Sequence, residues 1–132
     1  MINPSPLLRL AVRIDAAVSG AMALLLTVAA GILTPLLGLP EALLLESGLF
    51  LIGYAALVGW LGSRSVMPRA LVLLIVAGNA AWTLGSLALL FSGAVSPTGL
   101  GEVFVTLQAV AVGVFAELQY LGLRRSGGAQ SA

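Results

Sequence analysis

Residues 70–91 read ALVLLIVAGNAAWTLGSLALLF, a stretch without a single charged side chain. A helix needs about 20 mainly apolar residues to cross the hydrocarbon core of a bilayer. Arg64 and Arg69 lie directly before the stretch, and positive charges are enriched in the cytoplasmic loops of membrane proteins. The stretch therefore predicts a transmembrane helix over 70–91 that begins on the cytoplasmic side.

Three similar stretches predict further spans at about 13–33, 42–61 and 101–123. The basic residues form three clusters, which alternate with loops that contain none: Arg9 and Arg13, Arg64 and Arg69, Arg124 and Arg125. By the positive-inside rule the N-terminus, the middle loop and the C-terminus are cytoplasmic. We therefore expect one all-α membrane domain over 1–132, a four-transmembrane-helix bundle with both termini inside, which ends in a flexible tail over 126–132.

The composition agrees with this class and excludes several functions. Hydrophobic residues make up 60% of the chain and charged residues 8%, as in proteins that lie in lipid. The net charge of +1 provides no field that would attract nucleic acid. Because the chain has no Cys and no His, we expect no disulfide, no ordinary metal site and no cofactor. Ser19 or Ser86 would lack a His, Cys or Lys as general base, so we do not expect an enzyme.

Turn residues and short echoes divide the chain into halves. Pro35, Gly38 and Pro40 are expected to end the first helix. Asp15-Ala16-Ala17 is echoed by Asn79-Ala80-Ala81, and Leu61-Gly62-Ser63-Arg64 by Leu121-Gly122-Leu123-Arg124. These echoes indicate either two parallel helical-hairpin repeats or chance similarity among Ala, Leu and Gly.

Small residues recur along the first span at spacings of four and three: Ala16, Gly20, Ala23, Thr27 and Ala30. Such a stripe lets another helix backbone approach closely. It predicts helix contacts, either inside one bundle or between subunits.

Two embedded carboxylates are candidates for chemistry. Asp15 lies six residues beyond Arg9, and Glu117 seven residues before Arg124, so both are roughly 10 Å deep from the same side. If the first and last helices are neighbours, Asp15 and Glu117 could approach and share one proton. Alternatively, Asp15 pairs with Arg9 or Arg13 and Glu117 with Arg13 or Arg124.

Other polar residues lie within the last two spans. Asn79, Thr83 and Ser86 form one stripe, and Gln108 shares a helix face with Gln119. These stripes either line a cavity or make interhelical hydrogen bonds. Trp82 is either a packing residue or part of a ligand pocket. The membrane-embedded polar candidates are thus Asp15, Asn79, Trp82, Thr83, Ser86, Gln108, Glu117 and Gln119.

Several segments carry a family resemblance. They include Arg13-Ile14-Asp15-Ala16, Leu37-Gly38-Leu39-Pro40, Asn79-Ala80-Ala81-Trp82 with Ser86, Pro97-Thr98 and the stretch from Phe115 to Arg125. Together they resemble a group of small four-span bacterial integral membrane proteins without an established activity. The resemblance implies a location in the bacterial inner membrane and transfers no functional residue.

Two function classes follow. In the first, a non-catalytic inner-membrane protein, with the lipid bilayer around it, binds a partner membrane protein or a lipid-like ligand. In the second, a proton-coupled small transporter or channel acts as an oligomer through Asp15 or Glu117.

Overall fold

The computed structural model describes residues 1–128, and within this range the backbone is almost entirely helical. The elements in chain order are β1 (Ile2–Asn3), α1 (Pro6–Val28), α2 (Ala30–Leu37), α3 (Glu41–Gly62), α4 (Arg69–Ser92), α5 (Gly99–Arg124) and β2 (Gly127–Gly128). Neither a cis peptide bond nor a non-glycine residue with positive φ occurs in the described part of the chain.

Four of these helices, α1, α3, α4 and α5, are long and apolar enough to cross a membrane. The last three begin and end within two residues of the spans predicted at 42–61, 70–91 and 101–123. Large apolar side chains lie on the outside of the molecule, with Val28 83% and Phe91 87% exposed. An apolar exterior around hydrogen-bonded helices is the surface that lipid requires, and the chain has the form of a multi-pass membrane protein.

The first span departs from the prediction where it ends. Its helix begins at Pro6, where the Ser5 hydroxyl accepts a hydrogen bond from the Leu8 amide at 3.1 Å. It breaks at Ala29, and Pro35, which was expected to end it, lies inside α2. The Thr27 hydroxyl donates to the Ala23 carbonyl at 2.8 Å, a contact that bends helices by competing for a backbone acceptor. A glycine in the left-handed conformation, Gly38, then ends α2.

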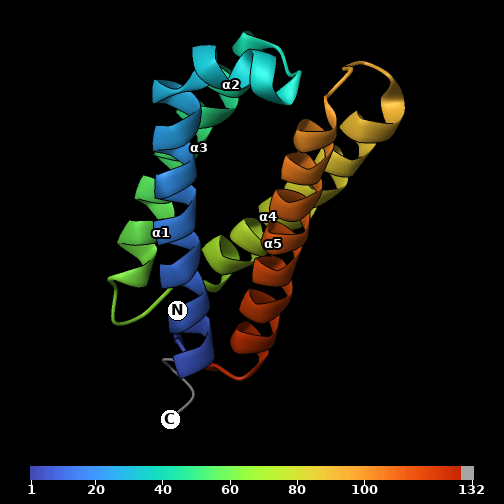
Figure 1. Cartoon of the computed structure of the whole chain (residues 1–132). Helices are drawn as coiled ribbons and strands as arrows, with labels where there is room; N and C mark the ends of the chain where they lie inside the picture. The colour runs from blue at the N-terminus through green and yellow to red at the C-terminus, as the bar shows by residue number, and fades with distance from the viewer. Residues whose placement is uncertain (129–132) are drawn as a thin grey trace.

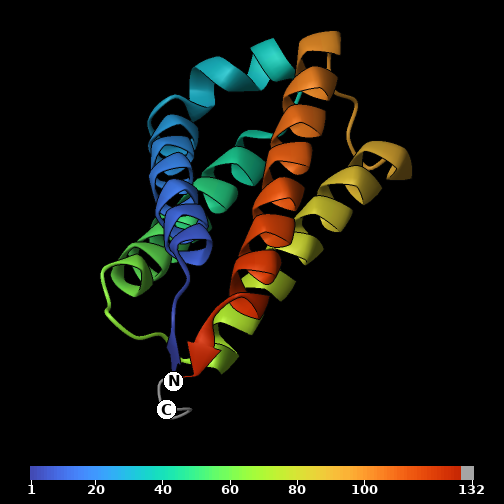
Figure 2. The same cartoon turned by 90° about the horizontal axis from the view of Figure 1, so that it is seen from below.

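The four long helices lie in the order α3, α1, α5, α4. Helix α1 packs closely against both α3 and α5, and α5 packs closely against α4, whereas α3 and α4 approach each other less closely and meet through side chains such as Phe50 and Trp82. Figures 1 and 2 show the α1–α3 hairpin beside the α4–α5 hairpin, with α2 crossing between them at one end. The bundle is therefore most loosely packed on the side between α3 and α4.

Small residues make the close contacts inside this bundle. A Cβ added to Gly20 would lie 3.9 Å from Ala55 Cβ, and one added to Gly59 would lie 3.9 Å from Ala16 Cβ, so these residues lie at the α1–α3 interface. A Cβ on Gly122 would lie 2.6 Å from the Leu8 backbone nitrogen. The small-residue stripe of the first span thus contacts α3 within the same chain.

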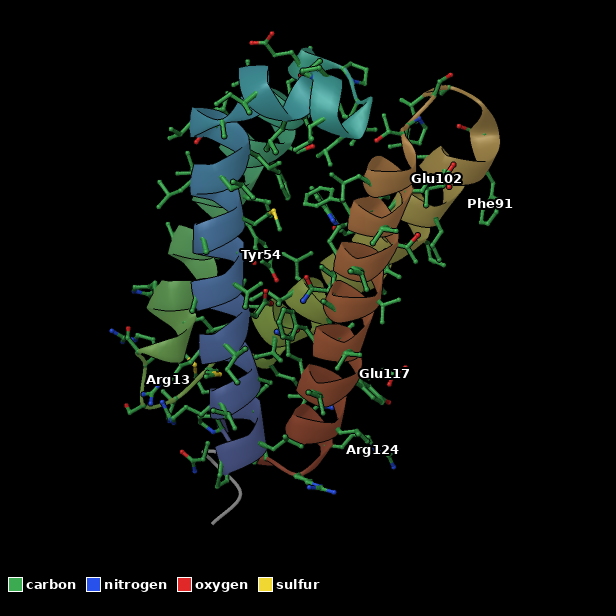
Figure 3. All side chains as sticks on the ribbon, in the orientation of Figure 1. Arg13, Tyr54, Phe91, Glu102, Glu117 and Arg124 are labelled. Carbon is green, nitrogen blue, oxygen red and sulfur yellow. The ribbon has the colours of Figure 1, made fainter. Side chains whose placement is uncertain are left out.

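The arginine-bearing segments meet at one end of the molecule. Ile2 pairs with Gly128 of β2, and its amide donates to the Met67 carbonyl at 2.8 Å. Arg9 donates to the Arg64 carbonyl at 2.8 Å. This arginine end, where Figure 3 also places Arg13 and Arg124, is opposite Glu102.

The predicted tail over 126–132 begins at the arginine end. Its first residue, Ser126, donates through its hydroxyl to the Gly122 carbonyl at 2.7 Å, and Gly127–Gly128 form β2. Residues 129–132 lie outside the described range.

Candidate functional site

Asp15 is the buried carboxylate of the bundle, with 2% of its side chain exposed. Its Oδ1 accepts a hydrogen bond from the Ser19 hydroxyl at 2.9 Å. Its Oδ2 accepts from the Tyr54 hydroxyl at 2.6 Å, from Asn79 Nδ2 at 3.1 Å and from Gln119 Nε2 at 2.7 Å. We call these five residues the Asp15 network.

The Asp15 network connects all four long helices. Asp15 and Ser19 are one turn apart on α1, Tyr54 comes from α3, and the two amides come from α4 and α5. Asn79 Nδ2 also donates to Gln119 Oε1 at 2.9 Å, so the amides of α4 and α5 contact each other as well as the carboxylate. Between α3 and α4 the network supplies a direct polar contact, from the Tyr54 hydroxyl to Asn79 Oδ1 at 2.9 Å.

The arginines of the N-terminal cluster are directed elsewhere. Arg13 Nε donates to the Gly62 carbonyl at 3.0 Å, and Arg9 donates to the carbonyls of Arg64 and Ser65. These are free carbonyls at and beyond the C-terminal end of α3, where cations are favoured. Arg9 and Arg13 therefore bind backbone carbonyls and do not pair with Asp15, contrary to the alternative predicted from the sequence.

Glu117 is not part of the network. Its side chain is exposed on α5, and Figure 3 shows it pointing away from α1, whereas Tyr54 points into the space between the two hairpins. The hypothesis that Asp15 and Glu117 share a proton required α1 and α5 to be neighbours, and these two helices do pack together. The residue that α5 presents to Asp15 is Gln119, two positions further on.

One hydrogen in the Asp15 network has two acceptors. The Tyr54 hydroxyl lies 2.6 Å from Asp15 Oδ2 and 2.9 Å from Asn79 Oδ1, but a phenol has only one hydrogen to donate. Turning the Asn79 amide over would not help, because its oxygen would then face the acceptor oxygens of Asp15 and Gln119 without a hydrogen between them. A proton on Asp15 Oδ2 would donate to Tyr54 and free the phenol to donate to Asn79.

A second polar cluster lies between α4 and α5. Trp82 Nε1 donates to Gln108 Oε1 at 2.7 Å, and Gln108 Nε2 donates to the Ser86 hydroxyl at 3.0 Å. One turn from Asn79, the Thr83 hydroxyl donates to the Ala109 carbonyl at 2.8 Å. Of the two alternatives for the polar stripe of the third span, cavity lining or interhelical hydrogen bonding, Thr83 and Ser86 follow the second.

A cavity of about 280 Å³ opens between α3 and α4, and we call it the lateral cavity. Its lining includes Phe50, Leu51, Tyr54 and Leu57 of α3; Leu74, Ile75, Gly78, Asn79 and Trp82 of α4; Ser19 of α1; and Val112 of α5. Ser19, Tyr54 and Asn79 belong to the Asp15 network and form the polar floor. The walls are apolar, and Phe50 stacks on Trp82 with ring centroids 5.7 Å apart.

Two members of the site were not among the residues predicted from sequence. Tyr54 is absent from the predicted candidates, and Ser19 appears there only as a possible nucleophile. A tyrosine hydroxyl near the middle of an apolar span needs a buried acceptor, which is the signal that identifies Tyr54. Ser19 follows Asp15 by four residues, a spacing that places both on one helix face.

No group of three or more His, Cys, Asp or Glu side chains that could hold a metal ion occurs within residues 1–128. Comparisons with protein-family models, with curated proteins and with solved structures gave no match. The functional assignment therefore depends on the lateral cavity and the Asp15 network.

Proposed function

We propose that this protein is a non-catalytic integral membrane protein that binds a small lipid-like molecule in the lateral cavity. The observation that carries the proposal is a preformed apolar cavity on the side where neighbouring helices pack most loosely. Ligand sites are typically concave and apolar, with a few polar groups that fix orientation. The lateral cavity has this form, with apolar walls and a floor of Ser19, Tyr54 and Asn79.

The position of the lateral cavity favours a ligand that arrives through the bilayer. Phe50 and Leu74, which line it, are 59% and 64% exposed on the outer surface. In a membrane these side chains contact lipid, so an apolar molecule dissolved in the bilayer would reach the cavity without crossing water. A partner protein could cover the same surface, but a hollow of about 280 Å³ favours a small molecule.

Binding of tritiated 2-naphthylmethanol to the full-length protein in nanodiscs of zwitterionic lipid tests this function. Gly78→Leu should abolish binding, because Gly78 lines the lateral cavity and a Cβ there meets nothing within 4 Å. Gly53→Leu is the matched control, since Gly53 also has free space but does not line the cavity. Binding no greater than to protein-free nanodiscs, or equal loss in both variants, would contradict the proposal.

We further propose a bacterial inner-membrane location with the arginine end in the cytoplasm. The positive-inside rule supports this orientation, because the N-terminal segment, the α3–α4 loop and β2 lie together there. The resemblance to small four-span bacterial membrane proteins supports the location. The α1–α3 and α4–α5 hairpins both return to this end, as two parallel repeats would.

A proton-coupled carrier, acting as an oligomer, is the second candidate function. The shared Tyr54 hydrogen favours it, because the Asp15 network has a place for one more proton. Asp15 would then exchange a proton for cargo held in the lateral cavity. Glu117 has no part in this version of the hypothesis.

A further inference from the structure

We infer that the ligand of the lateral cavity is a small apolar amine, bound in its protonated form with Asp15 as the charge partner. This inference rests on the proposed function and names the class of ligand. Three independent features of the site support it: an acidic group without a basic partner, hydroxyl groups turned toward that acid, and aromatic walls.

The first feature is the charge of the site. The groups that contact the Asp15 carboxylate are neutral: Ser19 of α1, Tyr54 of α3, Asn79 of α4 and Gln119 of α5. The arginines nearest in the chain, Arg9 and Arg13, bind carbonyls at the end of α3. An ionised carboxylate in a low-dielectric bundle strongly favours a cation nearby, and residues 1–128 place none in contact with Asp15.

The second feature is the direction of the hydroxyl dipoles. Ser19 and Tyr54 both direct their hydrogens toward the Asp15 network and both line the lateral cavity. The lone pairs of their oxygens are therefore left to accept hydrogen bonds from the cavity side. A floor of acceptors backed by a carboxylate recognises an N–H donor with positive charge, and it disfavours an anion or a carbonyl group.

The third feature is the aromatic wall. Phe50 stacks on Tyr54 with centroids 6.4 Å apart and on Trp82 with centroids 5.7 Å apart. The faces of such rings attract cations, more strongly where water is excluded. The same rings pack against an apolar body, so one wall accommodates both parts of an amphiphilic amine.

The size of the lateral cavity limits the ligand. Its volume of about 280 Å³ lies just below the range of drug-sized sites, about 300–1,000 Å³. A bicyclic aromatic group with a short aminomethyl arm suits this volume better than a complete two-chain phospholipid.

The experiment compares two probes of nearly equal shape, 2-naphthylmethylamine and 2-naphthylmethanol. The amine is protonated at pH 7, as alkylamines are, and the alcohol is neutral. Equilibrium binding of each probe is measured with the full-length protein in nanodiscs of zwitterionic lipid, with protein-free nanodiscs subtracted. We expect the amine to bind at least about tenfold more tightly. Asp15→Asn should remove this preference while the alcohol still binds.

Two further variants keep the test decisive. Tyr54→Phe retains the ring and removes the acceptor oxygen, so it should lower the preference for the amine even if Asp15→Asn fails to fold. Glu117→Gln removes an exposed acid outside the site and should leave the preference unchanged. Equal affinities of the two probes, or a preference that survives both Asp15→Asn and Tyr54→Phe, would overturn the inference and leave the proposed function standing. Binding of neither probe would overturn both.

Discussion

At the scale of single residues, the main question is how an apolar bundle tolerates Asp15. A carboxylate removed from water loses a large hydration energy, which only several close donors can offset. Four side chains from four helices supply them, with donor–acceptor distances of 2.6–3.1 Å. Every buried side-chain nitrogen and oxygen among the described residues has a hydrogen-bond partner. Asp15 is thus held by hydrogen bonds from all four long helices.

Replacing Asn79 by leucine tests this role. Asn79→Leu removes two donated hydrogen bonds, one of them to a carboxylate, so it should lower the free energy of unfolding by about 2 kcal/mol. Gln108→Leu is the comparison, because Gln108 belongs to the neutral Trp82 cluster, where a hydrogen bond contributes about 0.6 kcal/mol. Unfolding by SDS in mixed micelles measures both. A cost for Gln108→Leu equal to that for Asn79→Leu would show that the charge of Asp15 adds nothing.

The residues of the site were only partly predictable from sequence. Asn79 and Gln119 were identified because an amide within a span needs a partner. Their partner could not be identified, since Glu117 and Gln119 lie at similar depth and differ by roughly 200° around the helix axis. Only the rotation of α5, which depends on its packing against α1, decides which of the two meets Asp15.

At the scale of helices, the α1–α5 contact depends on Gly122. A Cβ at this position would lie 2.6 Å from the nitrogen and 2.7 Å from the Cα of Leu8, and a backbone cannot move away as a side-chain tip can. Gly122→Ala should therefore destabilise the protein by about 1–3 kcal/mol. Gly53→Ala, where nothing lies within 4 Å, should be neutral or stabilising by up to about 1 kcal/mol. The SDS unfolding midpoint should fall for Gly122→Ala, whereas for Gly53→Ala it should stay the same or rise.

Thr98 links the end of α2 to the beginning of α5. Its hydroxyl accepts from the Gly101 amide at 3.1 Å as the N-cap and donates to the Leu36 carbonyl at 2.8 Å. Thr98→Val should cost about 1 kcal/mol, the usual cost of losing a capping side chain, whereas Thr98→Ser should retain both contacts. Thermal denaturation in detergent measures the difference. Equal midpoints for the valine and serine variants would exclude a contribution from this hydroxyl.

The helices were more predictable than their interruptions. Runs of apolar residues between arginines place α3, α4 and α5 within two residues of their observed ends. The break at Ala29 follows neither a proline nor a glycine, and Pro35 continues a helix that it was expected to end. The Thr27 hydroxyl bond to Ala23 accompanies the break. Threonine in a span forms such bonds commonly, so its presence alone does not locate a bend.

At the scale of the whole molecule, the helix order creates the lateral cavity. A closed four-helix bundle would pack α3 closely against α4, but here the two helices lie at the ends of the row α3, α1, α5, α4 and pack only loosely. Periodicity in the sequence shows which residues are apolar and leaves open which helix pair is packed most loosely. The cavity therefore became visible only with the three-dimensional arrangement, although Asn79 and Trp82 were already candidates.

The distribution of charge between the two ends predicts how the molecule is inserted. The N-terminal strand, the α3–α4 loop and β2 meet at the arginine end, and Arg64 flanks the exposed Ser65 in that loop. Ser96 is exposed in the α4–α5 loop, and the charged residue closest to it along the sequence is Glu102. Basic residues are retained on the cytoplasmic side, so Ser65 should be inside and Ser96 outside.

Because the chain has no cysteine, Ser65→Cys and Ser96→Cys each introduce a single thiol that a membrane-impermeant maleimide can detect. We expect the reagent to label Ser96→Cys in intact bacterial spheroplasts and Ser65→Cys only after permeabilisation. Detergent-solubilised protein, in which both thiols should react, controls for accessibility. The opposite pattern would place the arginine end outside, and labelling of both variants in intact spheroplasts would mean that the protein inserts in two orientations. Asp15 lies roughly 9 Å beyond Arg9, so the accepted orientation also decides from which side a proton reaches the Asp15 network.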